Sequence, residues 1–148
     1  MVASTAFFVA PPQDAARYRR SQDIRQRFSM TRFMQKLDLT KLARLEAILT
    51  GSTSHLRSTN AIAETWSPHF IAGLELELAW IYVMPPDLLV ALQPIAPRVS
   101  AVAVSWARVE ECRRDGLDSS QLECILVELL EMLQHKKEGE LLFLLIRA

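Results

Sequence analysis

The chain has 148 residues, with 17 Lys and Arg against 17 Asp and Glu, and 50% of its residues are hydrophobic. Only 4 Gly and 7 Pro occur, which excludes collagen-like, mucin-like and wholly disordered proteins. This length is typical of one domain and is enough to bury a hydrophobic core without disulfides or metals. We therefore expect a single globular domain.

The cysteine content and the apolar stretches indicate a cytoplasmic protein. Two cysteines, Cys112 and Cys124, are too few for a disulfide framework. The apolar stretches at 78–86 and 141–146 are shorter than the roughly 20 residues that cross a bilayer, so no membrane span is predicted. The apolar run at 6–10 has no basic residue before it, unlike a secretory signal. A mitochondrial transit peptide at 17–32 is a less favoured alternative.

The zero net charge conceals a segregation of charge along the chain. Residues 1–57 contain 10 Lys and Arg and 4 Asp and Glu, a net charge of +6. Residues 58–148 contain 7 Lys and Arg and 13 Asp and Glu, a net charge of −6. The two halves could attract each other, or the basic half could bind a polyanion or an acidic protein surface.

In chain order, residues 1–12 end in two prolines and are expected to be a flexible leader. Arginines and apolar residues then predict a basic amphipathic helix over 14–37. A second helix is predicted to begin after a cap at Asp38 or Thr40 and to end at Gly51. These two helices make up the basic N-terminal part of the chain, 13–51. We expect residues 13–148 to form one helical domain.

The Ser- and Thr-rich residues 52–60 are expected to form a hinge before the acidic half, 61–148. Apolar residues at helical spacing favour a helix over 67–81, but alternation within 74–83 makes a strand the competing interpretation. Prolines confine 87–93 to a short helix. Further helices are predicted at 99–113 and 118–138, and the apolar run at 141–147 is either a strand or a helical turn.

No motif for catalysis, for metal binding or for nucleotide binding stands out. His55, His69 and His135 lie far apart, and neither cysteine has a second ligand at metal-binding spacing. Cys112 has acidic and basic neighbours but no histidine partner, so it is a weak candidate for a nucleophile. We expect no enzyme activity, no metal and no cofactor.

The arginines are the most informative feature of the basic half. With His55 and Arg57 they are the candidate residues for binding a partner or nucleic acid. The arginines are Arg17, Arg19, Arg20, Arg25, Arg27 and Arg32. A solvated helix face is the simpler interpretation. Residues 40–60 also resemble a helix-turn-helix, with Ala47 and Gly51 at its spacing, although Leu56 falls one position early for the expected apolar anchor.

The helix at 118–138 carries a broad leucine stripe that could serve as an oligomer seam or face the core. The residues of the stripe are Leu122, Leu126, Leu129 and Leu133. The stripe spans too few heptads for a typical coiled coil, which favours the core.

Together these patterns predict a mainly α protein, a compact bundle of about five or six helices, with one or two short strands at 74–83 and 141–147 as an option. The expected function is that of a non-enzymatic regulatory or adaptor protein acting through protein–protein interaction with another protein or with itself as a homo-oligomer. The alternative is a small DNA-binding transcriptional regulator, with the helix-turn-helix-like segment at 40–60 and a C-terminal dimerisation half. Nucleic acid is a less favoured partner.

Overall fold

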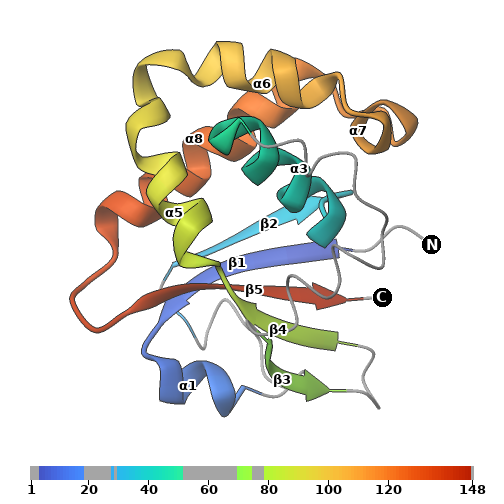
Figure 1. Ribbon diagram of the computed structural model, residues 1–148. Helices are drawn as coiled ribbons and strands as arrows, with labels where there is room; N and C mark the ends of the chain where they lie inside the picture. Colours follow the sequence, from blue (N-terminus) through green and yellow to red (C-terminus); the bar gives the residue numbers. More distant parts are fainter. Residues whose placement is uncertain (1–3, 19–27, 29, 52–69, 75–78, 148) are drawn as a thin grey trace.

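A computed structural model describes residues 4–18, 28, 30–51, 70–74 and 79–147. These residues form an α+β fold built on an antiparallel sheet of five strands in the order β2-β1-β5-β4-β3 (Figure 1). The strands are β1 (Ser4–Ala10), β2 (Thr31–Gln35), β3 (Phe70–Leu74), β4 (Ala79–Val83) and β5 (Leu141–Arg147).

Among the described residues, helices cover the sheet unequally, with six helical segments on one face and one on the other (Figure 1). Those on the first face are α3 (Leu39–Thr50), α5 (Pro86–Leu92), the 3-10 helix η4 (Gln93–Arg98), α6 (Val99–Ala107), α7 (Glu110–Arg114) and α8 (Ser119–His135). The short helix α1 (Pro12–Ala16) lies on the opposite face.

The prediction of a mainly α helical bundle is therefore wrong, because the sheet is the centre of the fold. Residues 4–10 were expected within a flexible leader, yet they form β1, which pairs with both β2 and β5. Phe7 and Phe8 are fully buried on opposite faces of this strand. A strand covered on both faces is apolar at consecutive positions, so it lacks the alternation that identifies a half-exposed strand.

The predicted basic helix over 14–37 is also corrected. Helix α1 ends at Ala16, residues 31–35 form the edge strand β2, and 19–27 lie outside the described residues. The register of β2 against β1 pairs Phe33 with Ala6 and Met34 with Thr5. Pairing with a strand more than twenty residues earlier is a long-range contact that local helical spacing does not reveal.

In the central part of the chain, the strand interpretation replaces the favoured helix at 67–81. The structure has β3 and β4 there, paired as an antiparallel hairpin, and residues 75–78 lie outside the description. The C-terminal run forms β5, the middle strand of the sheet, and four consecutive side chains of it, residues 142–145, are fully buried. The single strand considered at 74–83 thus corresponds to the end of β3 and to β4, with 75–78 outside the described residues, whereas the strand alternative at 141–147 corresponds to β5.

Helices with complete local signals are confirmed at α3 and α8. The Asp38 side chain accepts a hydrogen bond from the Lys41 amide, and Gly51 ends α3 with a positive φ of 68°. Asp118 and Gln121 form a reciprocal capping box at the start of α8. These contacts satisfy amide groups that a helix end leaves without an intrahelical partner.

Two hydrophobic cores lie on the two faces of the sheet. The larger core joins Phe7, Leu142 and Leu144 of the sheet to the helices above them, including Trp106 of α6. The smaller core lies beneath the sheet, where the Phe8 ring stacks on Phe28 and Phe143 with ring centroids 4.4 and 5.4 Å away. Each central strand thus contributes alternate side chains to each core.

The segment Pro86–Ala107 has the length and composition to cross a membrane, although the sequence analysis predicted no span. Its 22 residues include only two charged side chains, Asp87 and Arg98. In this fold the segment is three successive helices with Pro97 inside the 3-10 turn, and Leu92, Ile95 and Trp106 lie in the larger core. It therefore contributes core helices to this fold.

The role of β1 is tested by Phe8→Ala. Removing a fully buried ring that stacks on two others should lower the free energy of unfolding by about 3–5 kcal/mol. Val127→Ala, at a side chain that is 49% exposed, should change it by no more than about 0.5 kcal/mol. Urea denaturation measures both free energies of unfolding. An unchanged stability for Phe8→Ala would mean that residues 4–10 do not form a buried strand and are a flexible leader.

Candidate functional site

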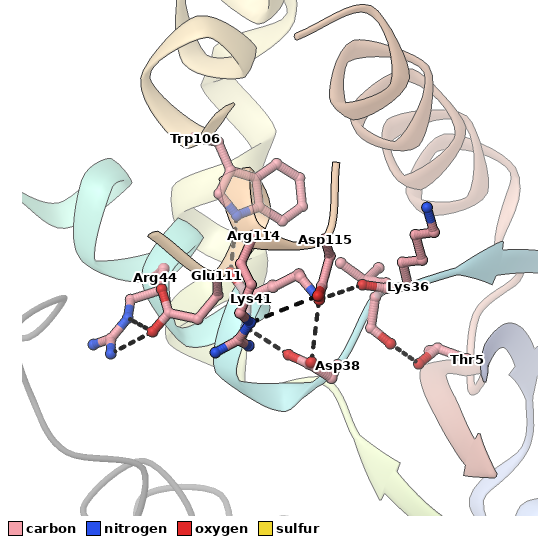
Figure 2. Close-up of polar contacts among 10 residues, drawn as sticks. Thr5, Lys36, Asp38, Lys41, Arg44, Trp106, Glu111, Arg114 and Asp115 are labelled. Carbon is pink, nitrogen blue, oxygen red and sulfur yellow. Dashed lines mark hydrogen bonds and ion pairs between the residues drawn. The ribbon is translucent and has the colours of Figure 1, made fainter. Parts of the chain in front are cut away.

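A buried lysine holds together three parts of the chain on the helical side of the sheet. The Lys41 side chain is fully buried, and its Nζ donates to the Lys36 carbonyl oxygen and to carboxylate oxygens of Asp38 and Asp115 (Figure 2). The Asp38 oxygen lies 3.2 Å from Nζ. An ammonium group removed from water needs such acceptors, because an unpaired buried charge costs several kcal/mol.

A second ion pair lies beside the first one. Arg44, one turn after Lys41 on α3, donates from Nε and Nη2 to Oε1 of Glu111, at 3.1 and 2.8 Å. The indole Nε1 of Trp106 donates to the backbone carbonyl oxygen of Lys41 at 2.9 Å. Helix α3 is therefore attached to α7 by two ion pairs and to α6 by a hydrogen bond.

The chain entering α3 is shaped to fit this cluster. Lys36 has a φ of 64°, in the left-handed region that non-glycine residues seldom adopt, and its carbonyl oxygen accepts from Lys41 Nζ. The neighbouring Leu37 carbonyl oxygen accepts from the Thr5 hydroxyl of β1 at 2.6 Å. The turn between β2 and α3 is thus fixed from both sides, which stabilises the unusual backbone conformation.

The cluster lowers the pKa of both carboxylates on the α7 side. The hydrogen bond from Lys41 holds the pKa of Asp115 below its ordinary value, and the charges of Lys41 and Arg114 add to this against the effect of burial. For Glu111, burial raises the pKa, but the hydrogen bond and charge of Arg44, a backbone hydrogen bond and the charge of Arg114 outweigh it. Both groups are consequently ionised at neutral pH.

Cys112 lies between these two carboxylates in sequence and is fully buried. Burial raises the pKa of its thiol to about 12, with Lys41 opposing the shift and the carboxylates of Asp38, Glu111 and Asp115 reinforcing it. The thiolate is the reactive form of cysteine, so this thiol is not activated at neutral pH. The structure gives no support to Cys112 as a nucleophile.

The outer side of α7 carries different charges from the inner side. Glu110, Arg113 and Arg114 line an open depression of about 490 Å³ there. Among the described residues, no group of three or more His, Cys, Asp or Glu side chains is placed to hold a metal ion.

The exposed side chains of the segment Pro86–Ala107, on α5, η4 and α6, carry few charges, and we call them together the outer face. Twelve of the residues from Pro86 to Ala107 are exposed, and all but Asp87 and Arg98 are uncharged. Val90 is 68% exposed and Val104 is 42% exposed. Helix α8 runs back alongside α6, where the Ser100 hydroxyl donates to Glu123 at 2.7 Å (Figure 1).

The structure does not bring the predicted basic residues together on one helix. Arg17 is exposed at the end of α1, whereas Arg32 is half-buried on β2 and donates to the Thr31 carbonyl oxygen at 3.0 Å. The other predicted residues lie outside the described part of the chain. They are Arg19, Arg20, Arg25, Arg27, His55 and Arg57.

The helix-turn-helix interpretation retains only its first helix, α3, followed by Gly51. Its second helix would fall within 52–69, outside the described residues. Two cations of the first helix, Lys41 and Arg44, are committed to the buried cluster, so they are not available to DNA phosphates.

The leucine stripe of α8 lies in the larger core. Leu122, Leu126 and Leu129 are fully buried, and Leu133 is half-buried against the same core. This placement corresponds to the core alternative rather than to an exposed oligomer seam.

Sequence reasoning missed the Lys41 and Arg44 cluster and the outer face. Two signals were available for the cluster, because Lys41 with Arg44 and Glu111 with Asp115 stand at helical spacings of three and four. Neither spacing shows that the two cations contact the two carboxylates, because 67 residues separate Arg44 from Glu111. For the outer face, the signal was the small number of charges between 86 and 107.

No protein family model, no curated protein and no solved structure matches this chain.

The charged cluster predicts an order of stability among variants. Lys41→Met leaves two partly exposed carboxylates that water can still reach, so it should cost about 1–3 kcal/mol. Asp115→Leu leaves the fully buried Lys41 ammonium group without one of its carboxylate partners and should lower the free energy of unfolding by about 3–5 kcal/mol. Lys137→Met, at an exposed position, is the control, and chemical denaturation measures all three. The reverse order of the first two variants would contradict this account of the cluster.

The lowered pKa of Asp115 predicts a pH dependence. Its stabilising contribution is fully present above the ordinary Asp value of 3.8 and is lost as the pH falls through the lower value of the folded chain. Wild type should exceed Asp115→Asn in unfolding free energy by about 1–3 kcal/mol at neutral pH, and the two should converge in acid. The exposed Asp87→Asn is the control in urea denaturation across pH. A difference that stays constant with pH would show that the carboxylate charge is not its source.

Proposed function

We propose that the protein is a non-enzymatic regulatory or adaptor protein that acts by binding another protein through the outer face of α5, η4 and α6. The observation that carries this proposal is the scarcity of charge on an exposed surface. Charged residues make up 23% of the chain, so 22 residues would be expected to hold about five, whereas 86–107 holds two. Depletion of charged residues is a compositional feature of the core of protein–protein interfaces.

Packing in the core does not account for this composition. Seven residues of the segment are buried, and the half-buried Leu89 and Ala107 also pack against the core, which leaves twelve exposed positions that do not cover it. The exposed positions could be charged without cost to the fold, as Glu131 and Gln134 of α8 show for polar side chains on a core helix. Their uncharged character therefore favours contact with a partner.

The outer face is also held in place before a partner arrives. Trp106 anchors α6 to α3 through its indole hydrogen bond, and Ser100 links α6 to α8. A surface that is already rigid loses little conformational entropy on binding, which favours affinity.

The experiment compares purified variants for binding to a partner identified by affinity capture and then purified. Val90→Glu/Val104→Glu places two charges on the outer face and should weaken binding by about a hundredfold or more, because desolvated charges at an interface centre are costly. Isothermal titration calorimetry gives the affinities, and thermal unfolding confirms that each variant folds.

The matched control is Gln13→Glu/Ala16→Glu, which adds the same charge to exposed positions of α1 on the opposite side of the sheet (Figure 1). It should bind the partner as the wild type does. The proposal is wrong if no captured protein rebinds in purified form, or if the valine variant binds as tightly as the control.

A further inference from the structure

We infer that the partner presents a contact surface that is acidic as well as apolar, and that the arginines that flank α6 and those of α7 bind its carboxylates. This inference rests on the proposed function, because it names the chemistry of the partner for the same face. It follows from how the fold divides the charges of α7 between an inner and an outer side.

The buried cluster removes two carboxylates from the outer surface. Glu111 and Asp115 turn toward Arg44 and Lys41 of α3, and their side chains are only 17% and 22% exposed. Arg113 and Arg114 of the same segment remain exposed, and Arg114 is 66% exposed although its Nε lies 3.6 Å from Asp115. A segment of mixed charge in sequence therefore presents a basic outer side.

Two further exposed arginines, Arg98 and Arg108, flank α6 as its N-cap and C-cap residues. They stand at positions i and i+10, with Ala101 and Ser105 on the same stripe between them. Val104 lies next to this stripe and is 42% exposed. The result is a weakly polar strip with an arginine at each end.

The strip retains an excess of positive charge within the described residues. Together with the outer side of the neighbouring α7 it contains Arg98, Arg108, Arg113 and Arg114, and no described carboxylate forms an ion pair with the first three. The bordering carboxylates are Glu110, which lines the depression beside Arg113, and Glu123, which accepts from Ser100. Guanidinium groups at the rim of an apolar strip are suited to bidentate contacts with carboxylates.

A protein partner fits this strip better than the other classes of partner. A second copy in a twofold contact would place the same arginines near one another, and the bordering carboxylates Glu110 and Glu123 are fewer than the four arginines of each copy. A membrane surface favours exposed Trp, Phe and Leu, whereas the exposed apolar residues of α6 are Ala101 and Val104. Single-stranded nucleic acid is bound by cations together with stacking aromatic side chains, whereas the exposed residues between Arg98 and Arg108 are Ser, Ala and Val.

The test uses two labelled amphipathic helical peptides with the same leucine face, one flanked by glutamates and the other by lysines. Fluorescence anisotropy with the full chain at low salt should show binding of the glutamate peptide that is tighter by about tenfold or more. High salt should reduce this preference. Arg108→Glu/Arg113→Glu should reverse it, so that the lysine peptide binds more tightly.

The control variant is Lys136→Glu/Lys137→Glu, which makes the same charge change at the far end of α8 (Figure 1). It should keep the wild-type preference. Failure of the glutamate peptide to bind, or an equal affinity for both peptides, would overturn the inference. Arginine-dependent binding to duplex DNA or to phosphatidylserine vesicles that is tighter than binding to the glutamate peptide would also overturn it.

The purified partner separates this inference from the proposed function. Binding that is lost in Val90→Glu/Val104→Glu but unchanged in Arg108→Glu/Arg113→Glu would overturn the acidic partner and leave the proposed function standing. Binding that depends on neither pair would overturn both.

Discussion

The buried ammonium group of Lys41 imposes the constraint on which the arrangement of the helices depends. Its side chain has no contact with water, so the fold must bring acceptors to it from the turn after β2 and from the end of α7. Trp106 then donates to the Lys41 backbone from α6. A single charge thus connects one edge of the sheet to the helices above it. The main effect of such a cluster is to specify one arrangement of the helices. Its net contribution to stability is small, because the cost of desolvating the charges offsets much of their attraction.

The same constraint determines the charge of the surface. Glu111 and Asp115 compensate Lys41 and Arg44 on the inside, so the outer side of α7 is left with Arg113 and Arg114 against Glu110, a net positive charge. Net charge along the sequence would describe residues 110–115 as slightly acidic, yet the exposed side of this segment is basic. The surface available to a partner is therefore a consequence of which charges the fold uses internally.

The cysteines illustrate how tertiary contacts decide reactivity. Cys112 is surrounded in sequence by residues of both charge signs, and sequence alone leaves the direction of its pKa shift open. In the structure burial dominates, and the thiol is held in its protonated form. Cys124, twelve residues later, is exposed on α8. The two cysteines differ because one faces the core and the other faces outward.

The sequence by itself determined those elements whose signals are local. Helices α3 and α8 follow from their caps, their apolar stripes and the glycine after α3, since each signal acts within a few residues. The sheet could not be derived in this way. Strands β1 and β5 are covered on both faces and carry no alternation, and their pairing joins the two ends of the described chain. Likewise, Lys41 and Arg44 were visible as helix residues, but only the tertiary structure placed them against α7, because contacts across 67 and 74 residues leave no local signal.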